Sequence, residues 1–303
     1  MRLVLTAFMC AVVSLAYAEP ANLAFTQAGD ETYTFDTGVL RGTLRSEGRS
    51  LGLSPLEYVP TGARLDGNNY GLFSHYRVFT ANKRYGAGAW EWPSTSALLP
   101  DGAVEVRWPA AEGRPFAMSA VYRWSAPDTL DLTTSVTAHE DLKAFESFVA
   151  SYLTEAFPAS VVYAKAGAAD APAFETTEKD KGDWQAFPRE RAAVSIIKDG
   201  RWDIEPNPVD WAIRSDFAVP LGLRRNPESG LCAVVMAWPG DCFAVMTPHA
   251  GEGHRSVYLC LFGRDVASGE TAVAHARLVV RVLNKDEDAV ALYGSFNEKR
   301  QAQ

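Results

Sequence analysis

The chain has 303 residues, a formal net charge of −8 and four cysteines. No cluster of lysine or arginine interrupts this acidic composition, so a nucleic acid and an anionic membrane surface are both disfavoured as partners. The length suits one large β domain with a well-buried core, or two smaller domains.

The first eighteen residues are typical of an export signal. Arg2 supplies the positive start, and residues 3–15 are almost wholly apolar. Ala16 and Ala18 offer small side chains at the offsets that a signal peptidase requires for cleavage before Glu19. The apolar run is too short to span a bilayer. We therefore expect a periplasmic or secreted protein with no membrane span, whose mature part, residues 19–303, forms a single domain.

Apolar residues alternate with polar ones in several parts of the mature chain. Residues 118–124 and 130–136 alternate on either side of a turn, which predicts a hairpin with one wet face. Residues 272–282 alternate again, whereas residues 231–238 and 257–262 are apolar on both faces and suit covered central strands. The predicted fold class is all-β, a two-sheet antiparallel supersandwich with a C-terminal helix.

Helix is indicated only at the C-terminus. Asn284 and Glu287 have the spacing of a helix N-terminal cap, and an apolar stripe follows them. The stripe consists of Ala289, Leu292, Tyr293 and Phe296. Residues 164–181 lack periodicity, and we expect them to form a long loop that can lie over a cleft.

Three cysteines remain once Cys10 leaves with the signal segment. Cys242 and Cys260 lie symmetrically about Gly251, so a simple hairpin would place them opposite each other. A disulfide between them is one alternative, but direct cross-strand geometry is often strained, which favours buried free thiols. The chain has no zinc-finger spacing, nucleotide-binding loop, dinucleotide fingerprint or His-Glu-x-x-His motif. We therefore expect no cofactor and no metal.

The densest group of candidate site residues lies at positions 68–92. This segment holds several aromatic rings and the charged or ionisable residues His75, Arg77, Lys83, Arg84 and Glu91, with Trp90 among the rings. Aromatic faces cover the C–H surfaces of sugars, and arginine bonds hydroxyls, uronates or sulfates, so this mixture favours a carbohydrate site. The alternative is a core hairpin whose rings pack inward and whose basic groups face water.

A second candidate is the glycine-rich turn at residues 247–254. His249 and His254 flank Glu252 there, and a histidine oriented by a carboxylate can exchange protons at neutral pH. The same residues could bind zinc, although their spacing matches no helix-borne metal motif. A polar hairpin tip without function is the remaining alternative.

Two further clusters carry carboxylates beside aromatic rings. Glu146 stands between two phenylalanines, so it is predicted to face solvent or a cleft, where an apolar wall would raise its pKa and suit it to act as a general acid. A solvated strand residue is its alternative identity. Trp202 and Trp211, with Asp203 and Asp210, could flank a sugar or pack in a loop.

Two stretches of this sequence resemble the galactose-mutarotase-like superfamily. The first is Gly62-Ala63-Arg64 followed by residues 72–77, and the second is residues 256–262 followed by residues 267–271. The resemblance implies a β-supersandwich in which Arg64 and His75 contact a sugar. Epimerases of this kind carry a catalytic glutamate at the end of the late strand, about where Phe262 and Gly263 stand here. The chain is also similar, in short motifs that imply no activity, to exported proteins of environmental bacteria.

Taken together, these features predict an exported carbohydrate-active protein that uses acid–base chemistry as a lyase, hydrolase or epimerase. His75 is the expected acid or base, with His249, His254 and Glu146 as further catalytic candidates. The expected substrate-binding residues are Arg64, Arg77, Arg84, Trp90, Glu91 and Trp211. The alternative is a non-catalytic carbohydrate-binding or structural envelope protein, and the oligomeric state stays open. The enzyme hypothesis requires His75 to lie near the loop histidines or a cleft carboxylate.

Overall fold

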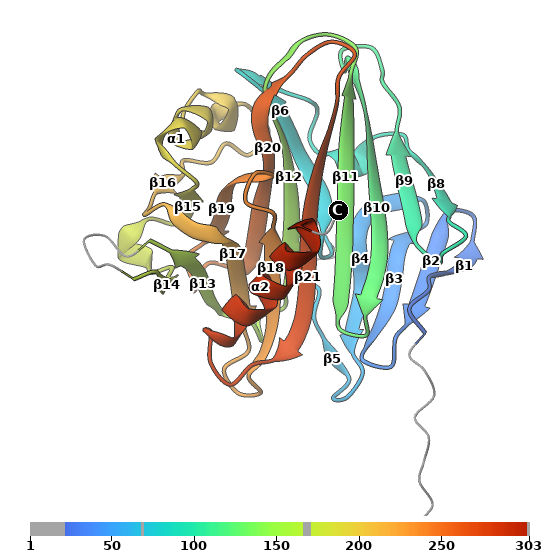
Figure 1. Ribbon diagram of the computed structural model, residues 1–303, viewed down its shortest axis with the longest axis vertical. Helices are drawn as coiled ribbons and strands as arrows, with labels where there is room; N and C mark the ends of the chain where they lie inside the picture. Colours follow the sequence, from blue (N-terminus) through green and yellow to red (C-terminus); the bar gives the residue numbers. More distant parts are fainter. Residues whose placement is uncertain (1–21, 68–69, 166–170, 302–303) are drawn as a thin grey trace, which may run out of the picture.

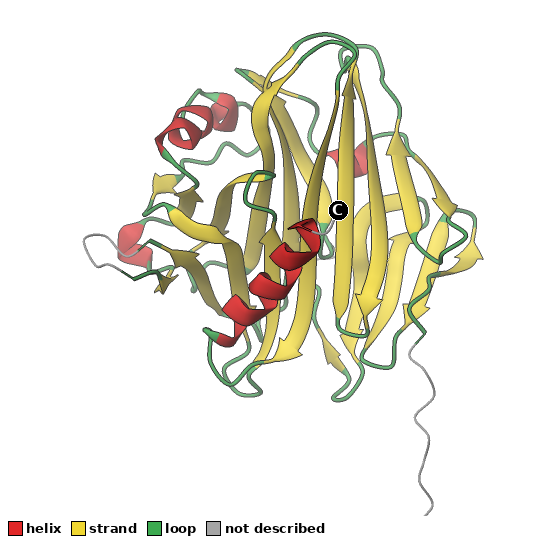
Figure 2. Ribbon diagram, viewed as in Figure 1, coloured by secondary structure: helices red, strands yellow, loops and turns green. Residues whose placement is uncertain are grey.

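The structure, a computed structural model, describes residues 22–67, 70–165 and 171–301. The export signal, Cys10 and the start of the segment at 68–92 lie outside these residues. The described strands form three sheets packed around a common core, with short helical segments at the surface (Figures 1 and 2). The predicted all-β fold with a C-terminal helix is confirmed. No described helix is long and apolar enough to cross a membrane.

A nine-stranded sheet forms one layer of the fold. The predicted hairpin lies within it, with Met118 opposite Val136 and Trp124 opposite Leu130. Their side chains point into the core, as the alternation predicts. In sheet order the strands are β14 (Ala173–Thr176), β13 (Ala159–Ala164), β17 (Phe217–Arg225), β18 (Leu231–Ala237), β21 (Thr271–Val282), β11 (Thr129–Ala138), β10 (Phe116–Ala126), β9 (Val104–Trp108) and β8 (Thr95–Leu98).

Opposite it lie a seven-stranded and a five-stranded sheet, linked by isolated bridges at Leu53–Leu72 and Asp66–Leu153. Among the described strands, only β15 and β16 pair in parallel. The seven strands, in sheet order, are β16 (Ala212–Ile213), β15 (Trp184–Pro188), β19 (Cys242–Pro248), β20 (Ser256–Val266), β12 (Leu142–Tyr152), β6 (Ser74–Thr80) and β7 (Lys83–Arg84). The five are β1 (Thr26–Gly29), β2 (Thr32–Asp36), β3 (Leu40–Ser46), β4 (Arg49–Tyr58) and β5 (Ala63–Arg64).

Helix α2 (Asp288–Gln301) covers the outer face of the nine-stranded sheet. Its predicted apolar stripe is confirmed, because Ala289, Tyr293 and Phe296 are buried against β17, β18 and β21, and Leu292 is partly buried there. The helix begins four residues after the predicted cap at Asn284. Each large apolar side chain buried in this way contributes roughly 1.5–3 kcal/mol of stability.

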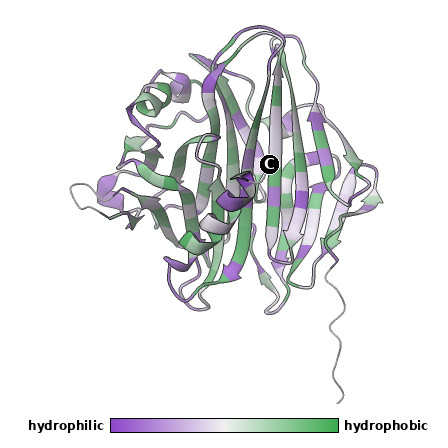
Figure 3. Ribbon diagram, viewed as in Figure 1, coloured by the Kyte–Doolittle hydropathy of each residue, from purple (hydrophilic) through white to green (hydrophobic). Residues whose placement is uncertain are grey.

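The outer face of the seven-stranded sheet is covered by residues 189–211. These residues contain α1 (Arg191–Ile197) and a 3₁₀ turn, η3 (Arg201–Asp203), neither of which the sequence predicted. Together they bury a second apolar cluster on β12, β19 and β20. Stretches of these strands are coloured as hydrophobic in Figure 3. The segment at 164–181, predicted as one loop, instead contains edge strand β14 and the 3₁₀ turn η2 (Lys179–Lys181).

The described cysteines Cys232, Cys242 and Cys260 are free and buried, as favoured over the disulfide. The hairpin of β19 and β20 exists, but an irregularity in its register pairs Cys242 with Leu261 and Ala244 with Cys260. Cys242 consequently lies in the core between the sheets, and Cys260 lies in the cluster on the outer face. Burial raises the pKa of the Cys242 thiol to about 12.

Candidate functional site

Strand β6 contains one more residue than its partner β12 where the two strands pass the candidate site. Val78 is paired with Ser147 and His75 with Val149, so Tyr76 and Arg77 together lie opposite Phe148. Such a bulge changes the direction of the side chains that follow it. Tyr76 and Arg77 therefore both line a cavity on the outer face of the seven-stranded sheet, while His75 points into the core.

His75 is fully buried, which corrects the prediction that it is the catalytic acid or base. Its Nδ1 lies 2.8 Å from the Ser147 hydroxyl, and its ring packs edge-on against Trp108 at 5.4 Å. Burial lowers its pKa to about 4 because the charged imidazolium would lose its hydration. A regular strand would place His75 and Arg77, two residues apart, on one face, and the bulge places them on opposite faces.

Glu146 is also buried, so its expected place in a cleft is wrong. Its side chain lies on the outer face with Phe148, but the segment at 189–211 covers that face. The Arg201 guanidinium donates to Glu146 Oε2 at 3.0 Å and to both carboxylate oxygens of Asp199. Burial raises the pKa of Glu146, and the nearby guanidinium opposes this shift. The group is an internal ion cluster that fastens η3 to β12.

Arg84 lies near the site, but its hydrogen bonds go to backbone carbonyl oxygens of the protein and leave few donors for a substrate. Its guanidinium donates to the carbonyl oxygens of Gly86, Ala87, Ile204 and Pro206. These bonds tie the turn after β7 to the covering segment and use the donors that a sugar would need. Burial lowers the pKa of Arg84, and the neighbouring Arg77 cation adds to this effect.

Arg64 and His249 also lie outside the cavities described below. Arg64 forms a two-bond ion pair with Asp66, at 2.6 Å from Nε and 2.7 Å from Nη2. His249 accepts a hydrogen bond from the Gly251 N–H on Nδ1, and its Nε2 lies 3.7 Å from Asp183. Both residues have local partners, and the structure does not bring them to the two cavities that hold the other candidates.

The structure brings four of the predicted residues, Arg77, Trp90, Trp211 and His254, to one cavity of about 370 Å³. This smaller cavity lies over the outer face of β6, β12 and β20, and the segment at 207–211 forms part of its wall. Besides these four, it is lined by Tyr70, Tyr76, Phe148, Tyr152, Trp184, Trp202, Asn207, Pro208, Val209 and Tyr258.

Sequence reasoning missed Tyr152, Tyr258 and Trp184 as lining residues. Tyr258 belongs to residues 257–262, which the sequence predicts as a covered central strand, and Tyr152 ends β12, whose residues 145–152 are all buried. A tyrosine in such a strand is nevertheless a usable signal, because its buried hydroxyl needs a polar partner. Here Ser256 donates to the Tyr258 hydroxyl, and burial raises the pKa of Tyr258 to about 12 and that of Tyr152 well above its ordinary value.

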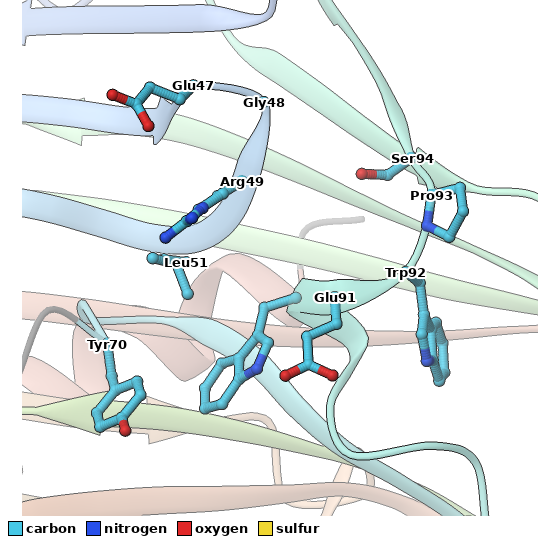
Figure 4. A pocket seen from close by; sticks show the side chains of 10 residues that line it. Glu47, Gly48, Arg49, Leu51, Tyr70, Glu91, Trp92, Pro93 and Ser94 are labelled. Carbon is cyan, nitrogen blue, oxygen red and sulfur yellow. The ribbon is translucent and has the colours of Figure 1, made fainter.

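A larger cavity of about 740 Å³ adjoins the first, since Tyr70 and Trp90 line both. Trp90 stacks on Tyr76 at 4.1 Å and on Tyr70 at 5.4 Å, which forms an aromatic edge between the cavities. Glu91, an exposed residue and a predicted substrate-binding residue, lines the larger cavity. Figure 4 shows Glu47, Arg49 and Leu51 on one side of it and Trp92, Pro93 and Ser94 on the other.

His254 is the histidine that faces the smaller cavity. Its Nδ1 lies 2.8 Å from Glu252 Oε1, and its backbone N–H donates to the other carboxylate oxygen. Partial burial raises the pKa of Glu252, but these bonds outweigh it and hold that pKa below its ordinary value. With Nδ1 donating to the carboxylate, Nε2 retains the lone pair that can accept a proton. The ring lies beside Trp184 at 5.2 Å.

No three His, Cys, Asp or Glu side chains in the described ranges are grouped so that they could hold a metal ion. The zinc alternative at residues 247–254 therefore gains no ligand set. The arrangement that remains is a groove with aromatic walls, one buried guanidinium, and one histidine–carboxylate pair. Such a groove can bind a polyhydroxylated ring and transfer a proton to or from it.

No protein-family model and no curated protein sequence matches this chain. Solved structures do. An aldose 1-epimerase-like protein of Escherichia coli K12 is 14% identical, with 83% of this chain and 99% of that chain covered and a TM-score of 0.47. A galactose mutarotase-related enzyme of Lactobacillus acidophilus is 10% identical, with 84% and 99% covered and a TM-score of 0.49. An α-N-acetylgalactosaminidase of Bifidobacterium bifidum is 13% identical, with 92% and 39% covered and a TM-score of 0.47.

The first two of these structures carry names from the superfamily that the two sequence stretches resemble. At these identities and TM-scores, the likeness assigns neither an activity nor a site residue to this chain.

Proposed function

We propose that this protein binds a carbohydrate in the groove formed by the two cavities and acts on it by acid–base chemistry at His254. The observation that carries the proposal is that His254, oriented by Glu252, and the buried Arg77 line one aromatic cavity. Aromatic faces cover the apolar C–H surface of a sugar ring, while arginine and tyrosine groups bond its oxygens.

The proposed ligand is longer than one sugar ring. The two cavities share Tyr70 and Trp90, and the flat faces of the stack at this edge are suited to a ring that crosses from one cavity to the other. In the larger cavity, the exposed Glu91, Glu47 and Arg49 supply polar contacts for hydroxyl groups. An oligosaccharide or a polysaccharide segment therefore fits the groove better than a free monosaccharide.

The chemistry favoured is proton abstraction, as in a lyase or an epimerase. Nε2 of His254 would accept the proton, while Glu252 would stabilise the imidazolium that forms. The phenols of Tyr152 and Tyr258 stay protonated because burial raises the pKa of each, so they can donate to a sugar oxygen. Glycoside hydrolysis usually needs two carboxyl groups flanking the bond, and no Asp or Glu is among the described residues lining the smaller cavity.

A carbohydrate-binding protein without turnover is the second candidate. The same lack of a carboxylate in the lining favours this candidate. Among the described lining residues, it leaves His254 as the group whose free lone pair can take up a proton. Both candidates place the ligand in the same groove. They differ in whether His254 takes part in making or breaking a covalent bond of the ligand.

The test combines binding and turnover with one matched pair of variants. The protein is incubated with a panel of oligosaccharides, and affinity, unsaturated products and new reducing ends are measured. The variant His254→Gln is expected to lose about 100- to 10,000-fold in turnover and to keep most of its affinity. His139→Gln, which changes an exposed histidine outside the groove, is expected to match the unchanged protein. Binding without any turnover supports the second candidate, and failure to bind every saccharide overturns both.

We also propose that the chain is exported, on the basis of residues 1–18. Sequencing the N-terminus of the protein from the periplasm or medium is expected to begin at Glu19. Retention of Met1 in a cytoplasmic fraction would contradict this.

A further inference from the structure

Arg77 is a buried cation for which the described residues supply no carboxylate. Its side chain is 4% exposed, and Nη2 donates to the carbonyl oxygen of Asn207 at 2.7 Å. Its Nε and Nη1 have no hydrogen-bond partner, and no described Asp or Glu forms a salt bridge with it. The cation of Arg84 is close enough to interact with it and cannot neutralise it.

Two other buried arginines show how this fold satisfies a guanidinium elsewhere. Arg201 lies under the same covering segment and is paired with Glu146 and Asp199. Arg224 has no carboxylate, but it donates to four carbonyl oxygens and to the Thr247 hydroxyl. Arg77 has neither arrangement, although a buried charge without partners is costly.

The smaller cavity also contains further donors without acceptors. Trp202 and Trp211 are among its lining residues, and their indole N–H groups are buried without a partner. With Nε and Nη1 of Arg77, the residues that line the cavity therefore carry four donor atoms without an acceptor. Sugar hydroxyls both donate and accept, so a site for a neutral sugar benefits from acceptors such as carboxylates. No Asp or Glu is among the described residues that line this cavity, and its unpaired donors suit a ligand group that only accepts.

We infer that the carbohydrate carries an oxyanion group, a uronate carboxylate or a sulfate ester, which binds Arg77 in the smaller cavity; this inference rests on the proposed function. Arginine presents its N–H groups as a planar fork that matches two oxygens of such a group. The guanidinium is held in place by the rings of Tyr76 and Trp202, whose centroids lie 5.1 Å and 5.0 Å from its central carbon. The bulge in β6 is what turns this guanidinium toward the cavity.

The preference for an oxyanion can be measured with three matched ligands. Calorimetry on the full-length mature protein compares an oligogalacturonate, a sulfated galacto-oligosaccharide and a neutral galacto-oligosaccharide of equal length. At least one anionic ligand is expected to bind about 10-fold to 100-fold more tightly than the neutral one, as for a charge-assisted bond in a partly dry site. The two anionic arms show whether the group is a carboxylate or a sulfate.

The variant Arg77→Gln is expected to bring the ratio of anionic to neutral affinity close to 1, and Arg77→Lys is expected to restore part of it. The control is Arg107→Gln, which changes an exposed arginine on β9 and should leave the ratio unchanged. If Arg77→Gln does not fold, the salt dependence of the ratio in the unchanged protein decides: a fall with rising salt supports the ion pair, and no fall contradicts it.

The outcomes separate this inference from the proposed function. Tight binding of the neutral ligand without any anionic preference, when lost in Trp90→Ala, overturns the oxyanion site and leaves the carbohydrate groove standing. An anionic preference that survives in Arg77→Gln also overturns the assignment to Arg77. Failure of all three ligands, together with the wider saccharide panel, overturns the proposed function itself.

Discussion

The buried imidazole of His75 makes the stability of the fold depend on pH within a defined window. Burial lowers its pKa from 6.5 to about 4. Between these values the unfolded chain binds a proton that the folded chain does not, so the free energy of unfolding falls as the pH falls. At about 1.4 kcal/mol for each pH unit, the full loss is roughly 3 kcal/mol. This stabilisation is complete above pH 6.5 and has disappeared below pH 4.

The perturbation that isolates this effect is His75→Gln. Urea unfolding, followed by tryptophan fluorescence, gives the free energy of unfolding of both proteins at several values between pH 7 and pH 4. At pH 7 the variant is expected to be less stable by about 1–3 kcal/mol, because the Ser147 hydroxyl and the Trp108 ring lose a fitted neighbour. Other groups titrate in both proteins, so the difference between the two curves reports His75 alone. Between pH 7 and pH 4, the free energy of unfolding of the unchanged protein should fall by about 3 kcal/mol more than that of the variant.

A difference that stays constant from pH 7 to pH 4 would refute the reasoning, because it would mean that the folded protein protonates His75 as readily as the unfolded chain. An exposed catalytic histidine, which the sequence suggested, would instead cost less than about 1 kcal/mol at neutral pH. His139→Gln, which changes an exposed histidine, is the control, and its free energy of unfolding at pH 7 should be within about 0.5 kcal/mol of that of the unchanged protein.

Three further predictions concern the packing around the site. Arg201→Met leaves Glu146 buried without its cation and should lower the free energy of unfolding by about 3–5 kcal/mol. The double variant that adds Glu146→Gln should recover much of this loss. A single variant as stable as the unchanged protein would contradict the ion cluster. The thiols of Cys232, Cys242 and Cys260 should resist a thiol reagent in the native protein and react fully in denaturant. The reason is that burial raises the pKa of Cys232 to about 11 and that of Cys242 to about 12. Rapid labelling of the native protein would show that the thiols are accessible. Phe296→Ala should cost about 3 kcal/mol in urea unfolding, since α2 anchors its stripe to the nine-stranded sheet through this ring, and a change below about 1 kcal/mol would mean that the helix is dispensable.

The architecture followed from local patterns wherever those patterns were regular. The period of two across residues 118–136 predicted a hairpin and its buried face, because every second residue is apolar and is buried in the core. The stripe on α2 was predicted for the equivalent reason at helical spacing. Trp90, Trp211 and His254 were named as candidates in three separate segments, and only the structure shows that they line one cavity.

The errors arose where a side chain's direction depends on distant parts of the chain. One extra residue in β6 separates His75 from Arg77, and no local signal in the sequence marks that bulge. Glu146 faces away from the main core much as expected, but α1 and η3 cover it from a segment some fifty positions later. Arg84 was identified as a donor, and carbonyl groups of that same segment take up its N–H groups. Covering contacts of this kind are tertiary, so periodicity cannot report them.

The order of strands in the nine-stranded sheet has a consequence for how the protein is made. Its last strand, β21, lies between β11 and β18 and joins the strands of the first half of the chain to those of the second. Until residues 271–282 have left the ribosome, this layer exists only as two separate groups of strands with unpaired edges. Native assembly of this layer must therefore wait for residues 271–282, and until they are made the two groups of strands stay open and available to chaperones.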